Sequence, residues 1–140
     1  MENDFVLNET LKNDTFLVGD LKLCRVLLMN RKEIPWFILV PRRNNIKETF
    51  ELSPDDTEQL FKEINSFAKE LNSIFEPDKV NIAALGNVVP QLHIHIIARY
   101  KTDSAWPSPV FGKLLETFYD DDSKNKIIDN VQRNILPKIE

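Results

Sequence analysis

The sequence predicts an α+β domain built on an antiparallel sheet. Two observations support this fold class: several apolar segments have the length of strands, and one long segment with helical spacing interrupts them. The chain has 140 residues, of which 42% are apolar, including nine Phe, and this is enough to close one hydrophobic core. We therefore expect a single domain over residues 1–140.

The N-terminal half predicts a short helix followed by two strands. The helix is expected around residues 7–11, within a polar stretch that carries scattered apolar residues. Apolar and β-branched residues predict strands at 21–29 and 36–40. The polar segment 30–35 ends in proline and has the composition of a hairpin connection.

The clearest element is a helix that begins after Ser53 and ends before Pro77. Serine suits the N-cap position, and Pro54 suits the first helical position. Apolar residues then recur at three- and four-residue spacing, which predicts one buried face. These residues are Leu60, Phe61, Ile64, Phe67, Ala68, Leu71, Ile74 and Phe75.

The C-terminal half predicts two more strands and a second helix. Residues 80–85 and 92–100 have the apolar character of buried strands, and Gly86 and Asn87 form a tight turn between them. Helical spacing returns at 122–136 and ends at Pro137.

Composition excludes several classes of protein. The formal net charge is -4, so no global positive field is expected to hold a nucleic acid. The chain has three glycines, and neither a Walker loop nor a GxGxxG fingerprint is present. Its apolar runs are far shorter than the ~20 residues that span a bilayer, and its start does not resemble a secretory signal. With one cysteine, Cys24, we expect a cytoplasmic protein with no membrane partner.

The two histidines of the chain lie two residues apart in the segment Gln-Leu-His-Ile-His-Ile-Ile, residues 91–97. Alternate side chains of a strand share a face, so Gln91, His93 and His95 are expected on one face, roughly 7 Å apart. Leu92, Ile94 and Ile96 are expected on the opposite face, toward the core.

This pattern leaves three interpretations open. The histidines could be hydrogen-bonded residues of a half-exposed strand. They could hold a metal ion, although the chain has no third histidine and no carboxylate lies nearby in sequence. They could also act on phosphorus, because a neutral imidazole is a nucleophile and its neighbour can move a proton. We favour the third interpretation, with no metal and no cofactor.

The segment 91–97 resembles the motif of the histidine triad (HIT) family, in which three histidines alternate with hydrophobic residues. Residues 86–90, Gly-Asn-Val-Val-Pro, resemble the family's lead-in to that motif. Residues 29–41 resemble its hairpin, and 98–99 with 106–107 resemble its C-terminal segment. The resemblance covers about residues 15–112, and we expect residues 113–140 to form a C-terminal helical extension.

The resemblance implies a five-stranded antiparallel sheet, usually in a homodimer, and substrates that contain a purine nucleotide such as AMP. It also implies cleavage at the α-phosphate of dinucleoside polyphosphates or nucleoside phosphoramidates. His93 matches the family's nucleophile, and His95 matches the histidine that contacts the phosphate or assists the leaving group. Asn30 matches a residue that touches the ribose, and Asn87 a polar residue near the phosphates.

Some positions need separate interpretation. Gly86 supplies a positive φ or a close backbone approach to phosphate. Gln91 replaces the first triad histidine, and we expect its amide to orient His93 without supplying a proton. Trp36 stands where many relatives carry a fourth histidine, so a proton relay through that position is missing. These departures keep a non-catalytic nucleotide-binding protein as the alternative. Arg99 is expected to be solvated at the end of its strand.

Overall fold

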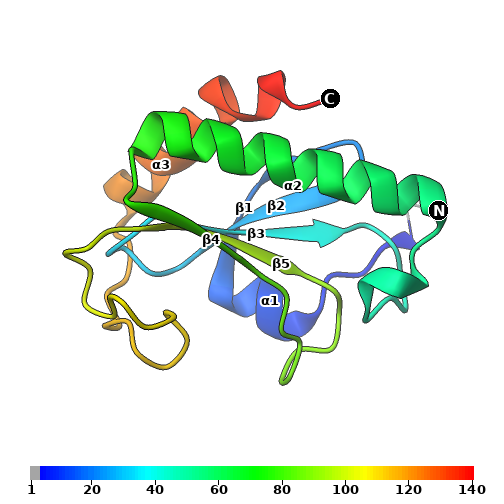
Figure 1. The fold of residues 1–140 in the computed structure, drawn as a ribbon, viewed down its shortest axis with the longest axis horizontal. Helices are drawn as coiled ribbons and strands as arrows, with labels where there is room; N and C mark the ends of the chain where they lie inside the picture. The colour runs from blue at the N-terminus through cyan, green and yellow to red at the C-terminus, as the bar shows by residue number, and fades with distance from the viewer. Residues whose placement is uncertain (1–3) are drawn as a thin grey trace.

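A five-stranded antiparallel sheet forms the centre of the computed structural model, which describes residues 4–140 (Figure 1). Its strands are β1 (Thr15–Asp20), β2 (Cys24–Met29), β3 (Trp36–Pro41), β4 (Lys79–Ala83) and β5 (Ile94–Arg99). The strands lie in the order β1-β2-β3-β5-β4, so β5 is an interior strand and β4 is an edge strand. The predicted α+β fold is confirmed.

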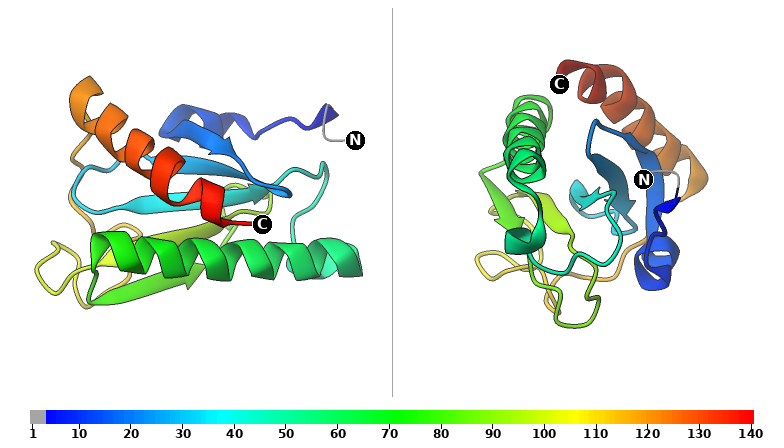
Figure 2. Two further views of the ribbon diagram at one scale, coloured as in Figure 1. Left: turned by 90° about the horizontal axis from the view of Figure 1, so that it is seen from above. Right: turned by 90° about the vertical axis from the view of Figure 1, so that its right-hand side faces the viewer.

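The helices cover the two faces of the sheet unequally (Figures 1 and 2). The helix α2 (Pro54–Phe75) and the C-terminal helix α3 (Asp121–Asn134) pack on one face, where they form the larger apolar core. The short helix α1 (Glu9–Asp14) packs on the other face, beside the loop that follows β5. The structure also has the 3-10 turns η2 (Thr49–Glu51) and η3 (Leu136–Lys138).

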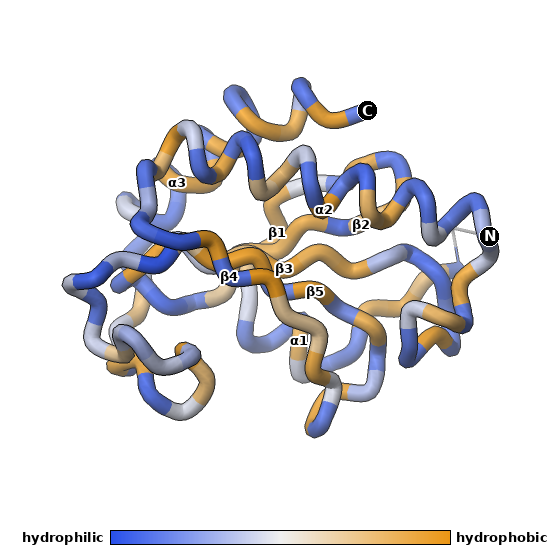
Figure 3. Tube along the Cα trace, viewed as in Figure 1, coloured by the Kyte–Doolittle hydropathy of each residue, from blue (hydrophilic) through white to orange (hydrophobic). Residues whose placement is uncertain are grey.

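The helix α2 has the boundaries that the sequence predicts. The Ser53 hydroxyl accepts a hydrogen bond from the Asp56 N–H at 3.1 Å, and Pro54 occupies the first turn. The helix ends at Glu76, which has a left-handed backbone with φ of 48°. In Figure 3 the outer side of α2 is hydrophilic, whereas hydrophobic residues follow the strands. None of the helices described within residues 4–140 has the combination of length and apolar character needed to cross a membrane.

The strand β1 was not predicted from the residues themselves. Its pairing with β2 shifts register between Leu17 and Gly19, as in a β-bulge. Because Leu17 is 63% exposed and Gly19 has no side chain, the apolar alternation that marks a half-buried strand is broken.

Local hydrogen bonds move three predicted boundaries. The helix expected at 7–11 begins at Glu9, because the Asn8 side chain caps it by accepting from the Thr10 N–H at 2.8 Å. The strand expected at 21–29 begins at Cys24, after a turn in which the Leu21 N–H donates to the Cys24 carbonyl. The helix expected at 122–136 is α3, capped by Asp120 and followed by η3.

The carboxylate of Glu63 lies fully buried between α2 and the sheet. Its two oxygens accept the backbone N–H groups of Leu23 and Cys24, each at 2.8 Å, and Gln59 donates to it at 2.6 Å. Burial, and next the Glu63 charge, raise the pKa of the Cys24 thiol well above its ordinary value. Cys24 is therefore a core residue, and Glu63 joins α2 to the turn that precedes β2.

Candidate active site

The two histidine rings lie side by side where β5 begins. His95 belongs to β5 and pairs with Ile38 of β3 and Ala83 of β4, whereas His93 lies just before the strand. The strand begins later than predicted, yet the two rings are in edge-on contact, with centroids 5.0 Å apart and planes at 70°. His93 is 7% exposed and His95 is 5% exposed, so the protein holds both rings largely out of solvent.

A backbone carbonyl fixes the protonation of His93. The Nδ1 atom of His93 lies 2.7 Å from the carbonyl oxygen of Gln91. A carbonyl can only accept a hydrogen bond, so Nδ1 carries the proton. In the neutral ring, Nε2 then has the lone pair, and no residue within 4–140 forms a hydrogen bond with it. Nε2 is thus the ring nitrogen of His93 that has an available lone pair.

His95 has the opposite tautomer, because its Nδ1 faces a donor instead of an acceptor. The Trp36 indole N–H donates to Nδ1 of His95 at 3.0 Å. Nδ1 must therefore carry the lone pair, and Nε2 carries the proton of the neutral ring. Burial, and next the neighbouring His93, lower the pKa of His95 to about 4. Near neutral pH, His95 is a hydrogen-bond donor rather than a cation.

The lowered pKa predicts that stability falls on acidification. Between the unfolded pKa of 6.5 and the folded pKa of about 4, the unfolded chain binds a proton at His95 that the folded protein excludes. We expect the free energy of unfolding to fall by about 3 kcal/mol across this window and to recover as the pH rises. Urea unfolding from pH 7 down to about 4 measures this. His95→Asn should flatten most of the slope, and an unchanged slope in that variant would contradict the assignment to His95.

The Gln91 side chain does not orient His93, and this expectation is wrong. Its amide donates to the Val6 carbonyl at 2.9 Å, and its oxygen accepts from the Asn8 N–H at 2.8 Å. Gln91 therefore holds the segment before α1, while only its backbone carbonyl serves His93. These partners are more than 80 residues away in sequence, so the motif itself gave no signal of them.

The structure brings Gly86 to the site. A cavity of about 190 Å³ is lined by Gly86, Gln91 and His93, together with residues 47–50, 84, 85 and 92. Gly86 has φ of 78°, a conformation that favours glycine. Asn87 follows it and is exposed near the tip of the loop between β4 and β5. The predicted positive φ at Gly86 is thereby confirmed.

Asn30 does not line this cavity. It follows the end of β2, and its side-chain oxygen accepts a hydrogen bond from the Tyr119 N–H at 3.0 Å. The oxygen is therefore occupied by the segment that leads into α3. A ligand that reaches Asn30 would meet its amide nitrogen as a donor.

The contact of the loop after β5 with His95 was not predicted from the sequence. Phe111 packs edge-on against His95, with centroids 4.9 Å apart, and against Trp36 at 5.7 Å. Phe111 lies in the loop after β5, outside the segment 91–97 that contains the histidines. No local pattern marks such a contact, because the strand and the loop meet only in the folded chain.

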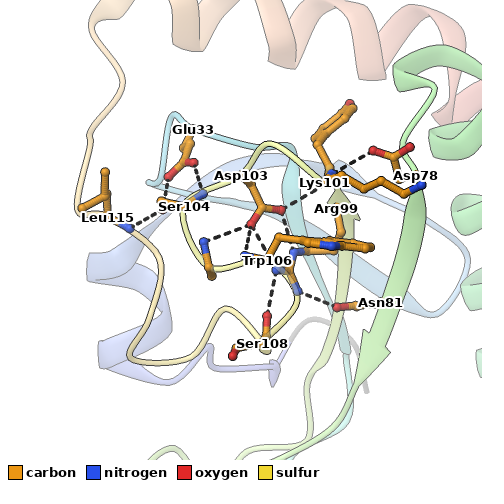
Figure 4. A network of polar contacts seen from close by, with 12 residues as sticks. Glu33, Asp78, Asn81, Arg99, Lys101, Asp103, Ser104, Trp106, Ser108 and Leu115 are labelled. Atoms are coloured by element: carbon orange, nitrogen blue, oxygen red, sulfur yellow. Dashed lines mark hydrogen bonds and ion pairs between the residues drawn. The ribbon is translucent and has the colours of Figure 1, made fainter.

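That loop is fixed by Arg99, which is buried and not solvated as predicted. Arg99 is 1% exposed and forms two hydrogen bonds with Asp103, at 2.9 and 3.1 Å (Figure 4). It also donates to the Asn81 side chain and to the Ser108 carbonyl. Burial is the largest single influence on the pKa of Asp103 and acts to raise it. The hydrogen bonds with Arg99 and its positive charge act in the opposite direction, and the pKa lies below its ordinary value. Asp103 lies four residues after Arg99 in the sequence, and this spacing is the signal from which the ion pair could have been predicted.

Within residues 4–140, no group of three or more His, Cys, Asp or Glu side chains lies close enough together to hold a metal ion.

The chain is similar to a known family and to several solved structures. The family model of the HIT domain matches residues 10–102. A histidine triad protein from Bradyrhizobium japonicum is 43% identical, with 94% of this chain and 98% of that chain covered and a TM-score of 0.91. One from Marinobacter aquaeolei is 41% identical, with 97% and 98% covered and a TM-score of 0.93. One from Sinorhizobium meliloti is 40% identical, with 96% and 99% covered and a TM-score of 0.92.

Comparison with curated proteins found no match. The match to the family model and the similarity to these three bacterial structures over nearly their whole length show that the chain belongs to the HIT domain family.

Proposed function

We propose that the protein is a nucleotide hydrolase or transferase that cleaves at an α-phosphate through a covalent nucleotidyl group on His93. The observation that carries this proposal is the 2.7 Å contact between Nδ1 of His93 and the Gln91 carbonyl. It leaves Nε2 as the lone-pair nitrogen, and it also stabilises the positive charge that the ring gains on attack.

The reaction has two steps. In the first, Nε2 of His93 attacks the α-phosphorus, an N–P bond forms, and the bond to the leaving group breaks with its electron pair on the leaving group. In the second, water attacks the same phosphorus, and the N–P electron pair returns to Nε2. The water proton is lost to solvent, and a nucleoside monophosphate is released.

His95 acts in both steps as a donor. Its Nε2–H is oriented by the Trp36 contact on the opposite side of the ring. We propose that it donates to a non-bridging phosphoryl oxygen, where negative charge gathers during attack. A neutral imidazole is a weak acid, so this role differs from proton donation to the leaving group.

The leaving group then decides how well a substrate reacts. A phosphate or polyphosphate departs as a stable anion, as in a dinucleoside polyphosphate, whereas the amine of a phosphoramidate has to gain a proton as it leaves. We propose that both substrate classes react, and we expect faster turnover of the anhydride.

The nucleotide is proposed to contact Gly86 and Asn87 through its phosphates and Asn30 through its ribose. The cavity of about 190 Å³ beside His93 is smaller than ordinary ligand pockets, so it suits a phosphoryl group rather than a whole nucleotide. An AMP-containing ligand would extend beyond it.

A homodimer is the proposed assembly, and the cytoplasm the proposed location. The edge strand β4 has one side that is unpaired in the sheet, and such an edge can pair with another chain. Ile82 is 48% exposed on β4, and Val88 is 89% exposed in the loop after it. These apolar side chains support an interface at that edge.

The alternative, a non-catalytic nucleotide-binding protein, has one observation in its favour. Both histidine rings are almost fully covered, and such cover restricts the approach of a phosphorus atom to His93. A covalent intermediate distinguishes the two functions.

The experiment is to trap that intermediate. The wild-type protein is mixed briefly with diadenosine tetraphosphate or adenosine 5′-phosphoramidate labelled at the α-phosphate, with and without a chelator. We expect acid-labile label on His93 in both conditions, none in His93→Ala, and slower labelling in His95→Asn. Saturable binding without label would support the non-catalytic alternative, and labelling that the chelator abolishes would support a metal-dependent enzyme.

A further inference from the structure

The indole of Trp36 ends a chain of ring contacts that begins at His93. His93 contacts His95, and His95 accepts the Trp36 N–H at 3.0 Å. We propose that Trp36 is a positioning residue that locks His95 in the Nε2–H tautomer and prevents proton transfer through Nδ1. The kinetic part of this inference rests on the proposed function, whereas the tautomer does not.

The indole of Trp36 can stabilise only one tautomer of His95. Tryptophan has one N–H donor and no nitrogen that can accept a hydrogen bond. If His95 took up a proton at Nδ1, two N–H groups would face each other across 3.0 Å. Histidine at position 36 could either donate or accept, so it could pass a proton onward. Trp36 therefore does more than fill the volume of a ring.

Packing keeps the two rings in this arrangement. Trp36 is 4% exposed, and its ring centroid lies 5.8 Å from that of His95. Phe111 closes the other side, edge-on to both rings. Rotation of either ring would require movement of β3 or of the loop after β5, so the contact is held by its surroundings.

The groups that face His95 offer no competing proton acceptor apart from His93. From β3 these are Trp36 and Ile38, from β4 Ala83, and from the loop after β5 Phe111. None of these four side chains titrates. Burial, and next the charge of His93, lower the pKa of His95. The indole N–H in addition favours the neutral ring, because it can bond only to an unprotonated Nδ1.

The tautomer of His95 determines whether a phosphoryl oxygen contacts an N–H group or a lone pair at Nε2. With Nδ1 occupied, Nε2 carries the N–H, and this is the group proposed to donate to the phosphoryl oxygen. Without the indole donor, His95 can also adopt the Nδ1–H tautomer, in which the Nε2 lone pair repels an anionic oxygen. We expect Trp36→Phe to lower kcat by about 3- to 10-fold with little change in KM, as loss of one oriented hydrogen bond predicts.

The test is long-range ¹H–¹⁵N NMR of the imidazole nitrogens in the whole protein. In the wild type we expect His95 with Nδ1 unprotonated and Nε2 protonated, unchanged from about pH 8 to 5. Trp36→Phe should show averaged nitrogen shifts from mixed tautomers and proton uptake at higher pH. Phe111→Leu is the matched control, since it alters the packing of His95 but keeps the indole donor, and it should retain the wild-type tautomer.

A second variant replaces Trp36 with benzothienylalanine, which keeps the shape of the ring and removes only the N–H, in case Trp36→Phe does not fold. Wild-type nitrogen shifts in either variant, or a protonated Nδ1 in the wild-type protein, would overturn the inference. Wild-type protein that shows the locked tautomer but forms no nucleotidyl-histidine would overturn the proposed function alone.

Discussion

His93→Ala is expected to lower kcat/KM for diadenosine tetraphosphate by about 10³-fold or more. The variant removes the nitrogen that attacks phosphorus, so the covalent route is lost rather than weakened. His95 cannot replace it, because its Nδ1 accepts the Trp36 N–H and its Nε2 carries the proton. Steady-state kinetics under matched conditions measure the effect.

The matched control is His95→Asn, which keeps His93 and replaces the neighbouring ring with a side chain that still donates a hydrogen bond. Its kcat/KM should fall by about 10- to 100-fold, which is the effect of a weakened hydrogen bond to a charged group. The unfolding midpoint of each variant separates lost chemistry from lost structure. Wild-type turnover in a folded His93→Ala variant would rule out the nucleophilic role.

Asp103→Ala is expected to lower the free energy of unfolding by about 3–5 kcal/mol. The substitution leaves the buried guanidinium of Arg99 without its ion-pair partner, although Asn81 and the Ser108 carbonyl still accept from it. It also removes the acceptor for the backbone N–H groups of Tyr100 and Trp106. Urea denaturation at neutral pH measures the loss.

A surface ion pair with the same contact distance and sequence spacing provides the control. Arg133 and Asp129 also lie four residues apart with a 2.9 Å contact, but their side chains are 75% and 58% exposed. Asp129→Ala should change the free energy of unfolding by less than about 1 kcal/mol. Equal losses in the two variants would show that burial does not determine the strength of the Arg99 pair.

Local signals explain why much of the fold could be predicted. The N-cap at Ser53, Pro54 and the apolar spacing along α2 all act within a few residues of one another. The alternation around His93 and His95 predicts correctly that the two rings lie together, with Leu92, Ile94 and Ile96 in the opposite core. These features depend on backbone periodicity, which a sequence displays directly.

Contacts between distant segments explain what could not be predicted. Trp36 and His95 are 59 residues apart, and Gln91 and Asn8 are 83 residues apart. The sequence showed that a histidine was missing at position 36 and that glutamine stood at position 91, but not which partners their polar atoms would find. Those partners depend on the packing of loops, for which the sequence has no periodic signal.

The buried carboxylate of Glu63 has a consequence for how the molecule unfolds. It joins the longest helix to two backbone N–H groups at the start of β2. If α2 separated from the sheet while both stayed folded, a charge and two donors would lose their partners, a cost of several kcal/mol. The helix and the sheet are thus expected to unfold as one cooperative unit, and circular dichroism of the helix and fluorescence of Trp36 and Trp106 should report a single transition.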